Sequence, residues 1–382
     1  MTIKRACWAW GTLLVVAAGL AGCGGGGGGG GGGPTTAATS SPSTPSTPAS
    51  SPSTTPTAPT GPSPTTTIAT ASYAASSVEA GVYSGINQIR QAGKWGTLTQ
   101  DALLDKAGRN MANYTIANYV RADGTFDPAM YNTDAATGWL MGHVQTVGKP
   151  LFTGVLPADR FKAAGQTDFQ VALENGGFYF SNFSTAAAID WCVDGWMRSI
   201  GHRQAALHPQ ANFIGVGVSV GQVKVPSGDT ASTCYLELTL PKTSLVYDSA
   251  WSAVFPVDGS TVNYVSDFYG KGLALSISFD KSVASVTSFV LTNRATGAAV
   301  VGAPLYYGVD RTVYTNIAFF QPTSPLPENT TFDASAIVVV QDSTGKQSTV
   351  EKKWAFATST DKYKSIATTK GTAIPKPSRI SQ

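Results

Sequence analysis

Charge is scarce in this sequence. Only 13% of its 382 residues are Asp, Glu, Lys or Arg, about half of the roughly 25% that is usual in soluble proteins. The formal net charge of +3 is too small and too dispersed to form a nucleic-acid surface. Histidine is rarer still, with three residues. We therefore expect no nucleic-acid partner, and any histidine chemistry has to use His143, His202 or His208.

A common signature of zinc hydrolases is also missing. No His-Glu-x-x-His segment occurs, so no single helix presents two zinc-binding histidines and a general base together. A metal site, if there is one, has to be assembled from residues that lie far apart in the chain.

Residues 1–23 have the layout of an export signal. Lys4 and Arg5 precede an apolar run that is too short for a transmembrane helix. The run ends in Leu-Ala-Gly-Cys at Cys23, which resembles the lipobox of bacterial lipoproteins and implies that Cys23 is lipidated. Gly24, in place of Asp, implies the outer membrane or the cell surface as the location of this exported, membrane-anchored protein. An ordinary secretory signal is the alternative.

The roles of the cysteines depend on this interpretation. Of the four, Cys7 is lost with the signal and Cys23 carries the lipid, so Cys192 and Cys234 remain. Exported proteins meet an oxidising compartment, which predicts a Cys192–Cys234 disulfide. A metal site on the two cysteines and a pair of free thiols are the alternatives.

Composition divides the remaining chain into four segments. Residues 24–77 are a glycine run and a Ser/Thr/Pro-rich tract, which predict a disordered stalk. Residues 78–243 mix helical and strand patterns and predict an α+β domain. Residues 244–360 contain short alternating strands that predict a β-sandwich of the immunoglobulin type. Residues 361–382 are expected to form a flexible basic tail.

Apolar periodicity locates the helices of the segment 78–243. Val82, Ile86 and Ile89 recur at helical spacing, and Gly93 can end that helix. Thr99 is the expected N-cap of a second helix, and "TAAAIDWCVDGWM" predicts a third. "NFIGVGVSVG" and "TCYLELTL" alternate as antiparallel strands do.

Six motifs follow one another in this segment, in this order: Asn-x-x-Arg in "GINQIRQ", "GH" at 142–143, "PADRFKAAG" at 157–165, "LENGG" at 173–177, "GWMRSIGHR" at 195–203 and "IGVGVS" at 214–219. Their order and spacing resemble the CAP superfamily of cysteine-rich secretory, antigen 5 and pathogenesis-related proteins (the SCP-like domain), and its bacterial branch in particular. The resemblance implies an α-β-α sandwich with a cleft framed by histidines and acids. The expected fold class is thus α+β, an α-β-α sandwich CAP/SCP domain followed by an all-β immunoglobulin-like sandwich.

The resemblance assigns His143, Glu174 and His202 to the cleft, as the ligand-binding residues and the only catalytic candidates. Two imidazoles and a carboxylate suffice for Zn²⁺ with an open position, so Zn²⁺ is the candidate cofactor and His143 and His202 are its candidate ligands. The position of the family's second acid holds Ser199, and Asp190 and Asp194 lie earlier on the same helix.

Each of these residues also has a structural interpretation. His202 suits the end of a helix, where a partly charged ring complements the helix dipole, and His143 and Glu174 can serve to hold loops. Arg160 is expected to be a structural ion-pair residue, and His208 a surface turn residue.

The leading functional hypothesis is a lipid-anchored extracytoplasmic binding or interaction module with a His/Glu cleft. Its ligand would be a metal, a lipid, peptidoglycan or another envelope component, or a protein, and the membrane is a partner through the anchor. The missing second acid argues against an enzyme. One alternative is a metal-dependent hydrolase of peptide or cell-envelope substrates, with Glu174 as ligand or base. The other is an adhesin-like envelope-binding protein.

Overall fold

The computed structural model describes residues 61–224, 228–248 and 250–363. The predicted signal with Cys23, most of the stalk and most of the tail lie outside the described residues, so lipidation stays a prediction. Within the described ranges, no helix combines the length and the apolar character that crossing a membrane requires.

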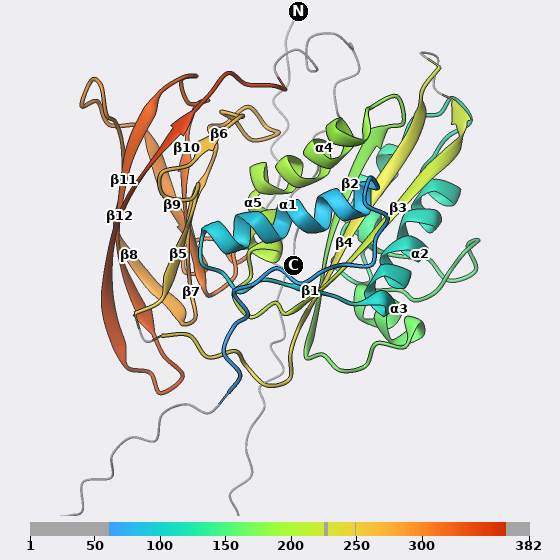
Figure 1. The fold of residues 1–382 in the computed structure, drawn as a ribbon, viewed down its shortest axis with the longest axis horizontal. Helices are drawn as coiled ribbons and strands as arrows, with labels where there is room; N and C mark the ends of the chain where they lie inside the picture. The colour runs from blue at the N-terminus through green and yellow to red at the C-terminus, as the bar shows by residue number, and fades with distance from the viewer. Residues whose placement is uncertain (1–60, 225–227, 249, 364–382) are drawn as a thin grey trace, which may run out of the picture. The chain divides into compact units, whose positions relative to one another are not determined.

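The first half of the described chain places helices around one sheet (Figure 1). The sheet has the strand order β1-β3-β4-β2, and its members are β1 (Thr99–Gln100), β2 (Val171–Phe180), β3 (Phe213–Lys224) and β4 (Thr230–Leu240). The helices are α1 (Val78–Ala92), α2 (Ala102–Tyr119), α3 (Pro157–Ala164), α4 (Thr185–Arg198) and α5 (Ile200–Ala206), with short 3₁₀ turns η1 (Pro128–Tyr131) and η2 (Met141–His143).

Helix α1 confirms the predicted periodicity. The Ser77 side chain caps its first turn by accepting a hydrogen bond from the Ala80 amide at 3.1 Å. Val82 and Ile86 are fully buried, and the helix ends at Gly93 as expected. The burial of this apolar stripe stabilises the helix more than its propensity does.

Helix α2 begins two residues later than expected. Thr99, the predicted N-cap, lies in β1 and pairs with Phe213 of β3. Asp101 caps the helix instead and accepts a hydrogen bond from the Leu103 amide at 2.7 Å. A carboxylate at this end also complements the helix dipole.

Two further four-stranded sheets make up the second half. One has the order β5-β7-β10-β9 and the other β6-β12-β11-β8. Their strands are β5 (Ser252–Phe255), β6 (Thr261–Val262), β7 (Leu275–Phe279), β8 (Ser282–Asn293), β9 (Gly302–Tyr306), β10 (Ile317–Pro322), β11 (Thr331–Gln341) and β12 (Gln347–Thr358).

The predicted fold class is wrong. Strand residues outnumber helical ones, and β-structure, in three small sheets, dominates the described chain. Two of these sheets are mixed and not antiparallel as expected, because the two-residue edge strands β1 and β6 pair parallel to β3 and β12. An α-β-α CAP sandwich followed by an immunoglobulin-like sandwich therefore does not describe this chain.

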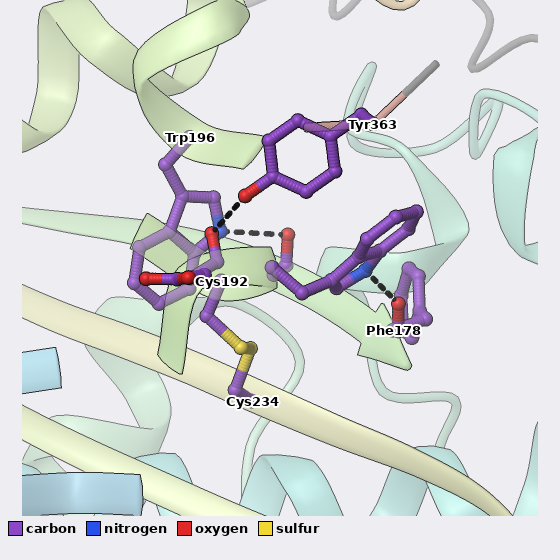
Figure 2. The surroundings of a disulfide bond; sticks show 8 residues. Phe178, Cys192, Trp196, Cys234 and Tyr363 are labelled. Atoms are coloured by element: carbon purple, nitrogen blue, oxygen red, sulfur yellow. Dashed lines mark hydrogen bonds between the residues drawn. A yellow bond between two sulfur atoms is a disulfide. The ribbon is translucent and has the colours of Figure 1, made fainter. Parts of the chain in front are cut away.

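The Cys192–Cys234 disulfide is present and confirms that prediction. It joins helix α4 to the middle of strand β4, as Figure 2 shows. Nearby, the Trp196 indole donates a hydrogen bond to the Gly176 carbonyl at 3.0 Å. A side chain at Gly177 would lie 2.8 Å from the Cys234 sulfur, so the disulfide requires a glycine at this point of β2.

Residues 61–77, the end of the predicted stalk, pack onto the rest of the described chain. The Thr97 amide donates to the Thr65 carbonyl at 2.7 Å. The Tyr73 hydroxyl hydrogen-bonds Asp105 of α2. The described part of this segment is therefore attached by specific contacts.

Helix α5 connects the first sheet to the strands of the second half. The buried Arg203 guanidinium donates to the Ala274 carbonyl at 2.5 Å and lies over the Phe255 ring, with its Cζ 4.4 Å from the centroid. Gln204 donates to the Thr312 carbonyl at 2.9 Å and accepts from the Tyr314 amide at 2.9 Å. These contacts lie within one compact unit that begins at Ala58. The domain boundary predicted at residue 243 stays a prediction.

Candidate functional site

A buried ionic cluster lies where η2, α3 and the edge strand β2 meet. The Glu174 carboxylate bridges His143, whose Nδ1 is 2.8 Å from Oε1, and Arg160, whose Nη2 hydrogen-bonds Oε2. Arg160 also donates to the main-chain carbonyls of His143 and Val155 at 3.2 and 3.1 Å. All three side chains of the cluster are buried. The cluster thus ties His143, through its side chain and its main-chain carbonyl, to β2 and α3.

The charge on Glu174 determines the state of His143. Burial alone would raise the pKa of the Glu174 carboxyl, but Arg160 and then His143 outweigh it and hold that pKa below its usual range. An ionised carboxylate can only accept, so the His143 Nδ1 donates the hydrogen. The other ring nitrogen, Nε2, therefore carries a lone pair when the ring is neutral, as it does in histidines that a carboxylate orients toward a metal.

A second acid, Glu237, faces Glu174 from the adjacent strand. The two residues are directly paired in the β2–β4 ladder and share one face of the sheet. Glu237 is fully buried, and neither of its carboxyl oxygens makes a standard hydrogen bond to the described residues. Burial, and then the charge of Glu174, raise its pKa well above the usual range. Both effects favour the protonated form of Glu237.

His202 lies on helix α5, within electrostatic reach of His143. Its main-chain carbonyl accepts a hydrogen bond from Asn175 Nδ2 at 2.9 Å, which ties α5 to β2. The residue keeps partial exposure, but its Nδ1 is buried and finds no hydrogen-bond partner in the described ranges. Burial, and then the nearby charge of His143, lower the pKa of His202 to about 3. The ring is neutral, with a buried polar nitrogen that lacks a partner.

The structure thus brings the predicted residues His143 and Glu174 into direct contact and places His202 within electrostatic reach of His143. Ser199 lies at the junction of α4 and α5. Asp190 and Asp194 do not join the site, because both bind the Lys362 ammonium, at 3.1 and 2.6 Å. The predicted structural role of Arg160 is confirmed by its ion pair with Glu174.

His208 differs from the expected surface turn residue. Its Nδ1 accepts a hydrogen bond from the Gln210 amide at 3.1 Å, and its ring meets that of Tyr314 edge-on, with centroids 5.6 Å apart. Burial, and then the charge of Arg90, lower the pKa of His208 to about 3. This histidine is a packed, neutral residue of the junction that α5 forms.

Two residues of the site were not predicted from sequence. Glu237 left a trace in the sequence, because it is the one charged residue of the predicted strand "CYLELTL". The same pattern is also typical of a strand with a solvent-facing acid, so it did not mark Glu237 as buried. Tyr235 lies two residues earlier on the same face, and its hydroxyl donates to the Gly142 carbonyl at 2.7 Å. It thereby ties the "GH" segment to strand β4, a role that only the strand pairing reveals.

The donors fit a metal ion in part. Neutral imidazoles are good ligands for Zn²⁺ and related ions. Glu174, however, engages Arg160 and His143 with its two oxygens. The described part of the chain contains no group of three or more His, Cys, Asp or Glu side chains that could hold a metal. The two histidines are the donors that remain, and the assignment of Zn²⁺ stays a prediction.

Comparison with known proteins adds little to this description of the site. No family model and no curated protein matches the chain. Among solved structures, it is similar to CopC from Methylosinus trichosporium OB3b, at 16% identity over 28% of this chain and 89% of that one, with a TM-score of 0.20. It is also similar to PcoC, a methionine-rich copper resistance protein from Escherichia coli, at 15% identity over 28% and 92% of the two chains, with a TM-score of 0.19. Likenesses at this level support no argument about what this chain does.

The predicted membership of the CAP superfamily is wrong. The six motifs do not lead to a matching family model, and no curated protein matches the chain. Short motifs of glycine, histidine and small residues mark turns and close packing in many folds. Their order along the chain was therefore insufficient to establish a family.

Proposed function

We propose that this chain is an exported binding module that takes up a transition-metal ion, such as Zn²⁺, between the imidazoles of His143 and His202. The observation that carries the proposal is the buried Nδ1 of His202, which has no partner among the described residues and lies within electrostatic reach of His143, whose own Nδ1 is fixed by Glu174. Imidazole nitrogens with free lone pairs form a site for a cation and not for an anion. Water or an incoming molecule would supply the other ligands.

The number of donors favours binding over catalysis. A resident catalytic zinc is usually held by three protein ligands, whereas two imidazoles would bind an ion more weakly and release it more readily. The two carboxyl groups beside the histidines are buried, so neither is placed to act on a substrate in solution. The hydrolase and the adhesin alternatives have no specific observation in their favour and stay predictions.

Export is supported by the disulfide. Structural disulfides persist in oxidising compartments and are rare in the cytosol, and the Cys192–Cys234 bond links two buried sulfurs of the core. Together with the signal-like N-terminus, this supports a location outside the cytoplasm. The lipid anchor at Cys23 and placement at the outer membrane or the cell surface belong to the same proposal.

Calorimetric titration of the exported chain with Zn²⁺ tests the proposal. We expect one ion per chain, and at least about a tenfold loss of affinity in both His143→Ala and His202→Ala, since each removes half of the donors. His208→Ala is the matched control and should bind as the native chain does. Equal affinity in all four proteins, or no binding at all, would refute the proposal.

A further inference from the structure

A cavity of about 520 Å³ opens between strand β2, the segment after α5 and the loops of the second half. Its size falls within the roughly 300–1,000 Å³ typical of small-molecule sites. His143, Glu174 and His202 are not among its lining residues. The cavity is therefore a separate feature, and a ligand bound in it would not depend on metal binding.

Aromatic rings on both sides give the cavity its shape. Trp139 lines it from the first half, and Tyr307 and Tyr314 line it from the second. Tyr307 is 38% exposed, so one of these rings is open to a ligand. Flat apolar rings that alternate with polar groups are suited to the C–H faces and hydroxyl rim of a sugar.

Polar groups line the same cavity as the rings. Asp280 and Asn316 line the same cavity and can hydrogen-bond the hydroxyls of a sugar. The His208 ring is also part of the lining and is neutral, because its pKa is lowered by burial and then by Arg90. The balance of charge in the lining is positive, since Lys281 and Arg311 face a single acid.

Arg311 is the cation best placed to take a ligand. Its guanidinium lies over the Tyr307 ring, with Cζ 4.4 Å from the centroid, and among the described residues it forms no ion pair. It is exposed and fully charged. A planar guanidinium with free donors is the side chain that binds a carboxylate most specifically.

We propose that this cavity binds an acidic sugar unit, with the sugar ring against Tyr307 and Trp139 and its carboxylate on Arg311. The walls are fixed relative to one another, because Gln204 of α5 holds the main chain at Thr312 and Tyr314. His208 packs against the ring of Tyr314 from the same side. The site is thus largely formed before the ligand arrives, which lowers the entropy cost of binding.

Cellobiuronic acid and cellobiose are suitable probes, because they differ only in one carboxylate. In calorimetric titrations of the full chain, we expect cellobiuronate to bind at least about tenfold more tightly than cellobiose. Arg311→Ala should remove that difference and leave cellobiose binding unchanged, whereas Tyr307→Ala should weaken both. Arg294→Ala and Tyr269→Ala, at exposed positions that do not line the cavity, are the matched controls.

The proposal fails if the native chain binds neither disaccharide at millimolar concentration. It also fails if the two bind equally well, or if Arg311→Ala keeps the preference for the acid. Loss of the preference in Arg311→Ala, with both controls unchanged, would support it. Zn²⁺ binding is measured separately and can fail without affecting this result.

Discussion

Glu174 and Glu237 face each other across strands β2 and β4, and both carboxyl groups are buried. Two adjacent carboxyl groups that are shielded from water cannot both be ionised. Arg160 settles which one carries the charge, because it pairs with Glu174 and leaves Glu237 to hold the proton. Glu174 therefore carries the charge that anchors His143 of the "GH" segment, and Glu237 stays neutral.

This division of roles predicts opposite results for two similar substitutions. Glu174→Gln leaves the Arg160 charge buried without a partner and should lower the free energy of unfolding by about 3–5 kcal/mol. Glu237→Gln replaces a neutral group by one of the same size and should change it by less than about 1 kcal/mol. Urea unfolding measures both. Equal losses in the two variants would show that Glu237 is ionised.

Acid should destabilise the protein through its buried histidines. The pKa values of His202 and His208 are lowered in the folded state to about 3, from 6.5. Between these values the unfolded chain binds more protons, so stability is complete above pH 6.5 and is lost as the pH falls toward 3.

Each histidine contributes at most about 1.4 kcal/mol per pH unit in that range. Urea unfolding of the native chain and of His208→Gln between pH 7.5 and 5 isolates one of the two contributions. The stability of the variant should fall less steeply with acid. Parallel curves would mean that His208 titrates normally in the folded protein.

The disulfide should contribute to stability as a crosslink. Cys192 and Cys234 are 42 residues apart, and closing a loop of that length is worth about 3–4 kcal/mol in the chain-entropy account. We expect the Cys192→Ala/Cys234→Ala double variant to lose about that much in urea unfolding. A reductant should have the same effect on the native chain and none on the variant. A reductant effect on the variant would point to another cause.

Arg203 should be the most sensitive residue of the α5 junction. Its buried guanidinium donates to the carbonyls of Met197 and Ala274 at 2.6 and 2.5 Å. Truncation to alanine leaves both carbonyls without this donor and creates a cavity where the side chain was. We expect Arg203→Ala to cost about 3 kcal/mol or more. Gln204→Ala, which removes two neutral hydrogen bonds, should cost about 1–3 kcal/mol. Scanning calorimetry ranks them, and the reverse order would contradict this account of the junction.

Local features of this fold were predictable because they depend on neighbours in sequence. The stripe of Val82 and Ile86 and the end at Gly93 define α1 without any tertiary information. The disulfide was predictable from counting cysteines in a chain whose N-terminus resembles an export signal. The parallel pairing of β1 with β3 and of β6 with β12 was not predictable, since two-residue strands leave no periodic pattern.

The site was predictable only in part for a related reason. His143, Glu174 and His202 stood out as rare or motif-bound residues, although the family inferred from them was wrong. Glu237 looked like any solvent-facing acid of an alternating strand. Its burial depends on the register that places it opposite Glu174 and on helix α2, where a Cβ at Gly108 would be 3.1 Å from its Cγ. Register and helix packing are long-range properties.

Histidine NMR during a Zn²⁺ titration tests the central claim most directly, because the chain has only three imidazoles to observe. The ring signals of His143 and His202, assigned from the two alanine variants, should shift together and level off at one ion per chain. The signal of His208 should not move. Unchanged signals for His143 and His202 at saturating Zn²⁺, or a shift of His208 alone, would contradict the account.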